Sequence, residues 1–202
     1  MSLEKKFEEI IDYLRSIKKF PIKKPHKDKT RKHILNDGEE SVEAFTLGKV
    51  RAYHTKIMVE SANNKKHRIL LKLLDDAVKL FDPDFRYTTI QLNKNVLTPV
   101  HRDKNNVGLS LALSLGEFTG GGIRQFNLGG GYRDIDTHNN FQFQDGSLLH
   151  QTLPFEGERY AFIFFFHKAG FNSPKPPPLT EILLNGMSKI SLEEYKEPTL
   201  IV

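Results

Sequence analysis

The chain has 202 residues, a length typical of one domain with one sizeable core. It contains no cysteine, which excludes disulfides, thiolate nucleophiles and cysteine-type zinc sites, so a bound metal needs His, Asp or Glu ligands. The formal net charge is +5, and no apolar run approaches the roughly 20 residues that a bilayer span needs. We therefore expect a soluble, intracellular protein of the cytoplasm or nucleus, without a membrane partner.

The first segment predicts an amphipathic helix over residues 3–17. Glu and Lys occupy one face, and the apolar residues at helical spacing are Leu3, Phe7, Ile10, Ile11, Leu14 and Ile17.

A basic stretch follows between Lys18 and Lys32, in which eight Lys and Arg residues accompany a single acid, Asp28. Such a run indicates a surface for an anionic partner such as nucleic acid. It is equally typical of a solvated connector, because a run containing Pro21 and Pro25 has little apolar surface to bury. The sequence leaves both interpretations open.

The middle of the chain predicts an entry strand over residues 44–53 and a helix over residues 69–81 that ends at Asp82-Pro83. From Arg86 onward the chain changes to short runs rich in Thr, Ile, Phe and Tyr, divided by Gly, Asn and Asp. The predicted strands are RYTTIQL, TPVHRD, GLSLALSLG, GGIRQF, YRDID, NNFQFQDG and RYAFIFFF. The sequence thus predicts an α+β fold with helices in front of an all-β core.

Strand periodicity alone does not separate a sandwich from a double-sheet jelly roll. The tail from residue 172 onward begins with Pro174 to Pro178, an extended linker, and continues as LTEILLNGMSKISLEEY, which predicts a short docking helix.

Three residues form a candidate metal site. His101 and Asp103, in TPVHRDKNN, lie two residues apart at the end of a predicted strand, so their side chains leave it on the same side. His150, in QDGSLLHQTLPF, stands at the end of a later predicted strand. Two imidazoles and one carboxylate on one octahedral face are typical of non-haem iron(II) and leave positions open for a co-substrate and oxygen. The alternative is that these are separate polar residues on strand ends.

Arg159 lies nine residues beyond His150 and opens the apolar run RYAFIFFF. Its rigid guanidinium suits a bidentate grip on a carboxylate at the bottom of an apolar barrel, such as that of a dicarboxylate co-substrate. The alternative is a surface residue that closes the EGER turn.

Other histidines compete for the metal. His26-Lys27-Asp28 repeats the H-x-D pattern, but it lies in the basic stretch with no strand to hold it, so we interpret it as solvated. His138 and His167 are alternatives to His150, although neither has an Arg at a comparable downstream spacing.

These motifs resemble a known family. YTTIQLNKN, HRDKNNVGLSLALSLGEFTGGG and DGSLLHQTLPFEGERYAFIFF are similar to the 2-oxoglutarate and iron(II) oxygenases, and among them to the thymine and methylcytosine hydroxylases related to JBP and TET enzymes. The resemblance covers Phe45 to Phe166. It implies a double-stranded β-helix (jelly-roll, cupin-like) core with N-terminal helices packed on it. The implied single domain, 1–202, divides into the helix and connector (1–43), the core with its supporting helix (44–170) and the Pro-rich extension (171–202).

The stretch NKN followed by HRDKNN also resembles the AlkB-type repair oxygenases, in which an Asn contacts 2-oxoglutarate before the H-x-D motif. This resemblance implies a co-substrate role for Asn93 and Asn95. One departure is Ala161, where TET-like enzymes offer a hydroxyl to the co-substrate carboxylate.

The resemblance implies iron(II) on His101, Asp103 and His150, and 2-oxoglutarate held by Arg159. With O2, the co-substrate would be decarboxylated to succinate and carbon dioxide while a C–H bond of the substrate is hydroxylated. The implied substrate is the methyl group of 5-methylcytosine or thymine in DNA or RNA, with nucleic acid as the partner. The substrate-contact candidates are Tyr87, Asn105, Asn106, Phe118 and Arg124, with Tyr53 and Tyr132 as further aromatic candidates.

Two alternatives remain at this stage. The same triad serves prolyl, lysyl and asparaginyl hydroxylases, so the substrate could be a protein. The third hypothesis is a jelly-roll binding module that keeps the ligands but no longer turns over.

Overall fold

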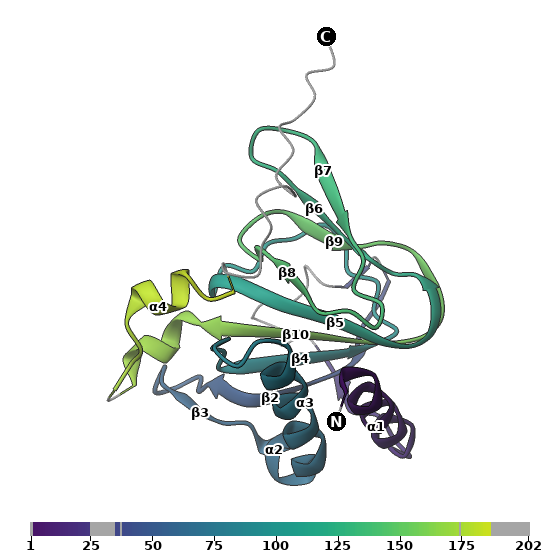
Figure 1. Cartoon of the computed structure of the whole chain (residues 1–202), viewed down its shortest axis with the longest axis horizontal. Coiled ribbons are helices and arrows are strands. Elements are labelled where there is room, and N and C mark those ends of the chain that lie inside the picture. The colour runs from purple at the N-terminus through teal and green to yellow at the C-terminus, as the bar shows by residue number, and fades with distance from the viewer. Residues whose placement is uncertain (1, 25–34, 37, 174, 187–202) are drawn as a thin grey trace.

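The computed structural model describes residues 2–24, 35, 36, 38–173 and 175–186, and its strands form two antiparallel sheets (Figure 1). Most of the predicted basic stretch, including His26 and Asp28, lies outside the described residues, as does the end of the tail.

The larger sheet has seven strands and carries most of the core. Its hydrogen-bonded order is β1 (Ile22–Lys23), β2 (Val42–Arg51), β4 (Thr89–Lys94), β10 (Phe155–His167), β5 (Asn106–Gly120) and β8 (Gln142–Gln144), with β3 (Met58–Glu60) paired to β2. The smaller sheet has the order β7 (Tyr132–Ile135), β6 (Ile123–Phe126) and β9 (His150–Thr152).

Two long helices cover one face of the larger sheet. Helix α1 (Leu3–Arg15) and helix α3 (Arg68–Phe81) pack side by side in front of β2, β4 and β10, with the short helix α2 (Ala62–Lys66) before α3 (Figure 1). Ile10 and Leu14 of α1 and Leu70 and Leu74 of α3 are at most 1% exposed. The apolar periodicity that predicted both helices is therefore the face that they bury.

Strand alternation gives the larger sheet two different faces. On β10, Tyr160, Phe162 and Phe164 belong to the core beneath the helices. The residues between them, Ala161 and Ile163, point to the opposite side, where they line a cavity. Strand β4 behaves in the same way, because Ile90 and Leu92 are core residues while Gln91 and Asn93 line that cavity. One pleated sheet thus separates an apolar core from a polar interior.

The C-terminal part of the described chain docks on the sheet as predicted. After the 3-10 helix η2 (Lys168–Asn172), helix α4 (Leu179–Leu183) buries Ile182 completely against β5. Gly108, with φ +69°, makes this possible, because a Cβ at this position would overlap the Ile182 carbonyl oxygen.

The structure confirms the mixed helix and sheet class, the two long helices and the entry strand. It corrects the strand expected at TPVHRD, because Thr98–Val100 is irregular and His101 belongs only to an isolated bridge. Pro99 has no N–H to donate to a strand partner, which explains the interruption. Among the described helices, none is long and apolar enough to cross a bilayer.

Candidate metal centre and its cavity

A two-residue bridge brings together chain segments that are 49 positions apart. His101 N donates to His150 O and His150 N donates to His101 O, both at 2.9 Å. Beside this pair, Thr152 N donates to Thr98 O at 3.1 Å and the Thr98 and Thr152 hydroxyls lie 2.7 Å apart. His150 opens β9 rather than ending a strand, which corrects its predicted place.

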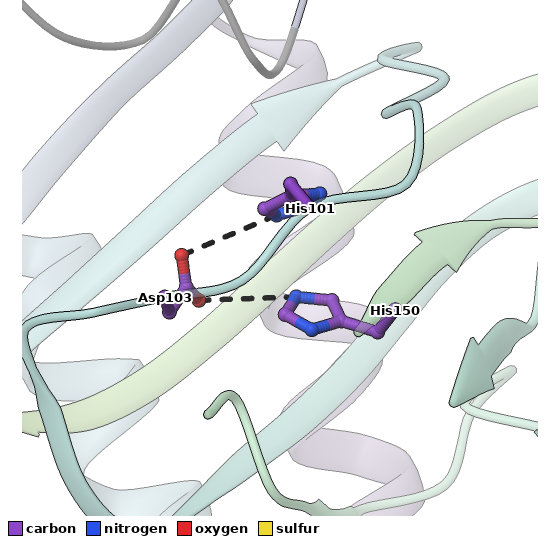
Figure 2. Close-up of side chains that lie close together, drawn as sticks. All are labelled: His101, Asp103 and His150. Carbon is purple, nitrogen blue, oxygen red and sulfur yellow. Dashed lines mark ion pairs between the residues drawn. The ribbon is translucent and has the colours of Figure 1, made fainter. Parts of the chain in front are cut away.

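The His101, Asp103 and His150 side chains converge on one point (Figure 2). His101 Nε2 lies 4.0 Å from Asp103 Oδ1, and His150 Nε2 lies 3.9 Å from Asp103 Oδ2. The three ligand atoms all lie within 4.8 Å of one another, so side-chain rotations that move them closer together would close the set around one ion with metal–ligand bonds of about 2.1 Å. Within the described chain, this is the one group of His, Asp and Glu side chains arranged in this way.

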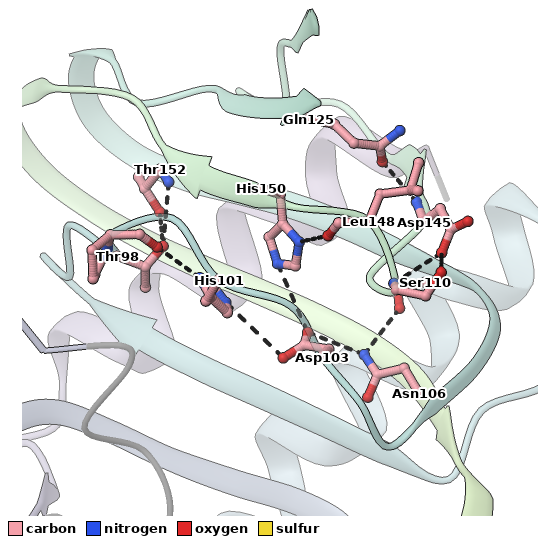
Figure 3. A network of polar contacts seen from close by, with 12 residues as sticks. Thr98, His101, Asp103, Asn106, Ser110, Gln125, Asp145, Leu148, His150 and Thr152 are labelled. Carbon is pink, nitrogen blue, oxygen red and sulfur yellow. Dashed lines mark hydrogen bonds and ion pairs between the residues drawn. The ribbon is translucent and has the colours of Figure 1, made fainter. Parts of the chain in front are cut away.

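Backbone carbonyls orient both imidazoles. His101 Nδ1 lies 2.8 Å from Pro99 O. His150 Nδ1 lies 2.9 Å from Leu148 O (Figure 3). A carbonyl oxygen only accepts, so Nδ1 carries the proton in each neutral ring. The lone pair then belongs to Nε2, the nitrogen that faces Asp103, as a metal ligand requires.

The Asp103 carboxylate is held from two sides. Asn106 Nδ2 donates to Asp103 Oδ2 at 3.2 Å and contacts Ser110 Oγ at 3.4 Å (Figure 3). Asp103 N donates to Gly146 O at 2.8 Å, and Gly146 lies so close that a Cβ there would sit 3.3 Å from Asp103 Cβ. These contacts fix the carboxylate between the two histidines.

The triad opens into a cavity of about 510 Å³ between the two sheets. Arg159, Ala161 and Ile163 of β10 form part of its wall, and Gln144 of β8 forms another part. Arg102 and Lys104, which flank Asp103, also line the cavity. Its charged lining is therefore mainly cationic.

Arg159 is the most unusual residue of this wall. It is 2% exposed, its Nε is buried without a hydrogen-bond partner, and its guanidinium lies 5.7 Å from the Phe118 ring and 5.4 Å from the Phe155 ring. Burial lowers its pKa to about 10. No carboxylate of the described residues lies within ion-pair distance of it. A buried cation without a counter-charge is costly for the fold, so an anion bound beside Arg159 would lower that cost.

The two asparagines before the metal ligands have different positions. Asn93 lines the cavity, and its Oδ1 accepts a hydrogen bond from Gln91 Nε2 at 2.9 Å. Asn95, with φ +52°, instead binds the backbone of Arg159, whose N donates to Asn95 Oδ1 at 2.8 Å. Asn95 therefore positions Arg159 and is not among the residues that line the cavity.

Among the substrate-contact candidates, Asn105 and Asn106 line the cavity, and Asn106 also holds Asp103. Tyr87 does not line it, because its hydroxyl donates to Asp75 of α3, and its pKa is raised mainly by burial. Phe118 is 7% exposed and packs against His138, with the ring centroids 4.1 Å apart. It is not among the residues that line the cavity.

Arg124 and the remaining aromatic candidates point away from the cavity. On β6, Ile123 lines the cavity, so Arg124 projects to the other face, where it pairs with Asp134 at 2.7 Å and stacks on Tyr132 at 3.9 Å. Tyr53 is 56% exposed beyond the end of β2. The competing ligand His138 contacts Gly116 O, and His167 lines the cavity but accepts from Ala169 N, outside the triad.

Sequence reasoning missed Gln91 and Gln144. Both line the cavity, and the Oε1 atom of Gln144, a residue only 1% exposed, is buried without a partner. Gln91 carries a usable signal, since it lies two residues before Asn93 and therefore shares its face of the strand. Gln144 lies in the predicted strand NNFQFQDG, which forms β8.

Comparison with known proteins supports the fold. Neither a family model nor a curated protein matches the chain. A 2OG-Fe(II) oxygenase-family oxidoreductase from Burkholderia pseudomallei has 16% identity and a TM-score of 0.50, over 80% of this chain and 78% of that one. NgTET1 in complex with 5mC DNA has 13% identity and a TM-score of 0.50, over 81% and 68% of the two chains.

A prolyl hydroxylase from Trichoplax adhaerens, in complex with a hypoxia-inducible-factor peptide fragment, has 11% identity and a TM-score of 0.52 over 87% of this chain and 83% of that one. The chain thus shares its fold with one structure bound to DNA and with one bound to a peptide. These nearly equal scores do not single out the TET-like group.

Proposed function

We propose that this chain, as one domain with a double-stranded β-helix core, is an iron(II)- and 2-oxoglutarate-dependent dioxygenase that hydroxylates a C–H bond. The observation that carries the proposal is the pairing, in one cavity, of a His–Asp–His cluster with a buried arginine that lacks a counter-charge. The fold shared with 2OG-Fe(II) oxygenase structures supports it.

The donor set fits iron(II). Two neutral imidazoles and one carboxylate are the ligands of the facial triad, which leaves the remaining positions of an octahedral ion free. The carbonyls of Pro99 and Leu148 already fix both rings in the ligating tautomer, and Asn106 holds the carboxylate. His101, Asp103 and His150 would hold the ion.

The buried end of the cavity fits a dicarboxylate. Arg159 would pair with the distal carboxylate of 2-oxoglutarate, because an anion there supplies the charge that the described residues do not. Burial among Phe118 and Phe155 strengthens such a pair by excluding water. Ala161 and Ile163 leave room for the apolar carbon chain between Arg159 and the metal ligands.

When bound, iron and 2-oxoglutarate supply the oxidising chemistry, in which O2 converts 2-oxoglutarate to succinate and carbon dioxide and inserts one oxygen atom into the substrate C–H bond. The protein residues would bind the iron and 2-oxoglutarate and orient the substrate. The bridge between His101 and His150 fixes the spacing of two ligands.

The substrate that we favour is the methyl group of 5-methylcytosine or thymine in DNA or RNA. NgTET1, which shares the fold, is bound to DNA containing 5mC. Arg102 and Lys104 would meet phosphates at the cavity, and the unpartnered Gln144 amide would meet the hydrogen-bonding edge of an unstacked base. Tyr87, Phe118 and Arg124 have no part in this revised site.

A protein hydroxylase is the alternative, because a peptide-bound prolyl hydroxylase has a similar TM-score. Gln144 would then bind a backbone amide. Hydroxylation of a defined oligonucleotide containing 5-methylcytosine, detected as a mass gain of one oxygen, supports the first substrate. The same mass gain on a proline-, lysine- or asparagine-containing peptide, and not on the oligonucleotide, supports the alternative.

The first experiment is an anaerobic iron(II) titration with 2-oxoglutarate, followed through the weak visible charge-transfer band of the chelate. We expect the band in the wild type, none in His150→Ala, and a band unchanged in Asp84→Ala, which removes an exposed carboxylate. Saturation of the site to 100 times its Kd would also stabilise the fold by about 2.7 kcal/mol. Absence of the band in the wild type would support an inactive jelly-roll binding module instead.

Arg159 has its own test in the same titration. Arg159→Met should lower the affinity for 2-oxoglutarate by about 100-fold or more, because two charge-assisted hydrogen bonds are lost. The same variant should melt a few degrees higher, since an unpaired buried cation opposes folding. Arg51→Met, on an exposed arginine, is the matched control. Unchanged affinity in Arg159→Met would contradict the proposed anchor.

A further inference from the structure

Lys23 belongs to the basic stretch between Lys18 and Lys32, but its side chain is partly buried and binds residues of the neighbouring strands. It lies on β1, and its Nζ donates to Thr46 Oγ1 at 3.0 Å and to Gln91 Oε1 at 3.2 Å. Both partners are buried, with 7% and 8% exposure. Gln91 lines the cavity, so Lys23 reaches the cavity wall from behind.

The hydrogen bonds of Gln91 have only one consistent direction. An ammonium group only donates, so the atom facing Lys23 must be the acceptor, Oε1. On the other side of the amide, Gln91 Nε2 donates to Leu92 O at 3.0 Å and to Asn93 Oδ1 at 2.9 Å. If the amide were reversed, its NH2 group would face the Lys23 ammonium, donor against donor. Its oxygen would face the Leu92 carbonyl, acceptor against acceptor.

The direction passes on to Asn93. Because its Oδ1 accepts from Gln91, its Nδ2 is the atom left to face the cavity. Within the described residues, no acceptor takes a hydrogen bond from Asn93 Nδ2. A chain of hydrogen bonds that starts at a cation also polarises each later donor. Asn93 therefore presents a strengthened N–H donor to the cavity.

The register of the sheet places this donor near Arg159. Asn93 is paired directly with Ala161 across β4 and β10, and Arg159 precedes Ala161 by two residues on the same face. Diagonal neighbours of this kind lie about 7–8 Å apart at the backbone, within reach of long side chains. Ala161 offers no polar side-chain atom, so the neighbouring side chain that does so across the strand pair is Asn93.

We propose that Lys23 is a positioning residue, which acts through Gln91 to hold the Asn93 amide as a hydrogen-bond donor toward the carboxylate bound by Arg159. The inference rests on the proposed function, because it needs 2-oxoglutarate in the cavity. Lys23 thereby connects the basic N-terminal segment to the co-substrate site.

The sharpest variant is Gln91→Glu. The carboxylate keeps an ion pair with Lys23 but cannot donate to Asn93, so the Asn93 amide turns over and presents an oxygen to the cavity. We expect 2-oxoglutarate affinity to fall about tenfold or more, equivalent to one charge-assisted hydrogen bond.

Lys23→Met keeps the length of the side chain and removes the charge. It should lower the affinity for 2-oxoglutarate by about three- to fivefold. The Gln91 contact with Leu92 still favours the same amide direction, so only the polarisation of the Asn93 donor by the Lys23 charge is lost. Lys23→Arg retains a cationic donor and should restore most of the affinity. Lys24→Met is the matched control, since it makes the same change at the exposed neighbouring residue.

The readouts are the 2-oxoglutarate Kd from the anaerobic charge-transfer titration and, separately, the Kd for Mn²⁺ without co-substrate. We expect 2-oxoglutarate to bind more weakly to Gln91→Glu and Lys23→Met, while the Kd for Mn²⁺ stays unchanged. Equal 2-oxoglutarate affinity in all variants overturns the relay, and a parallel loss of Mn²⁺ affinity reduces Lys23 to a structural role. A wild type that binds Mn²⁺ but not 2-oxoglutarate refutes the proposed co-substrate itself, and the relay with it.

Discussion

The two faces of strand β10 differ although they are made of alternate residues of one segment. Tyr160, Phe162 and Phe164 are at most 1% exposed and pack under α1 and α3, whereas Arg159, Ala161 and Ile163 face the cavity. The core face is filled, while the cavity face keeps open volume, an unpaired buried cation and polar amides. The difference teaches that stability and binding are carried by opposite sides of one sheet, so substitutions on the two sides should have separable effects.

The largest expected change in stability comes from the core face. Phe162→Ala removes a fully buried ring that is paired with Leu92 and Leu113 in the neighbouring strands. We expect a loss of about 3–5 kcal/mol in unfolding free energy, which lowers Tm by roughly 6–20 °C. Thermal melts measure this, with iron affinity unchanged at low temperature. Ile163→Ala, on the cavity face, should cost less, about 2 kcal/mol; equal losses would break the comparison.

Gly121→Ala should lower both the stability of the fold and the affinity for 2-oxoglutarate. Gly121 has φ +74°, and a Cβ there would lie 2.9 Å from both Cδ and Nε of Arg159. The backbone strain costs about 1–2 kcal/mol, and displacement of Arg159 should weaken 2-oxoglutarate about tenfold or more. Gly120→Ala is a matched control, since Gly120 has φ +73° but a Cβ there would meet the Pro154 backbone rather than Arg159. Equal 2-oxoglutarate affinities in the two variants would show that Gly121 does not position Arg159.

Gly146→Ala sharpens the comparison by changing the cavity face alone. The new methyl group would lie 3.1 Å from Asn106 Nδ2 and 3.3 Å from Asp103 Cβ, so the Asn106 amide must move by a few tenths of an ångström, which disturbs its hydrogen bond to the Asp103 carboxylate. We expect Mn²⁺ affinity to fall about tenfold, as when a partner of a metal ligand is lost, with little change in Tm. Gly129→Ala should do neither, because nothing lies within 4 Å of a Cβ at that position.

The smallest effect concerns pH and the core face. His67 is 2% exposed, its Nε2 has no hydrogen-bond partner in the described chain, and burial lowers its pKa from the ordinary 6.5. The unfolded chain binds this proton more readily, so stability is present above pH 6.5 and falls as the pH drops toward the folded-state pKa, by at most about 1.4 kcal/mol per pH unit. Melts between pH 7.5 and 5 should show a steeper fall for the wild type than for His67→Gln. Identical slopes would exclude His67 as the group responsible.

Local periodicity was sufficient to predict the framework. Helices α1 and α3 follow from apolar spacing that one face can bury, and β4 and β10 from runs rich in β-branched and aromatic residues. The short elements β1, β3 and α2 depend on contacts with distant strands and carry too few residues for a local signal. The strand expected at TPVHRD was wrong because Pro99 interrupts backbone pairing.

The sequence predicted the site residues whose type indicates their chemistry. It did not predict those whose place depends on which face of a strand they occupy. His101, Asp103 and His150 converge as expected, and Arg159 lines the same cavity. Tyr87 and Arg124 do not line the cavity. The sequence does not reveal this for Arg124, because it stands one residue from the inward-facing Ile123, nor for Tyr87, because its hydroxyl binds Asp75 of a distant helix. Lys23 could not be linked to Gln91 from sequence, since the contact spans 68 positions.

The reciprocal hydrogen bonds between His101 and His150 also have a consequence for solvent exchange. Each of these backbone amides is closed by the other ligand's carbonyl rather than by a regular ladder. Both should therefore exchange slowly with deuterium in the metal-free protein, and they should open together, since one separation of the two segments breaks both bonds. The exchange rates of these two amides thus report how often the segments that carry His101 and His150 separate. Slow exchange would mean that the two segments are already ordered before an ion binds.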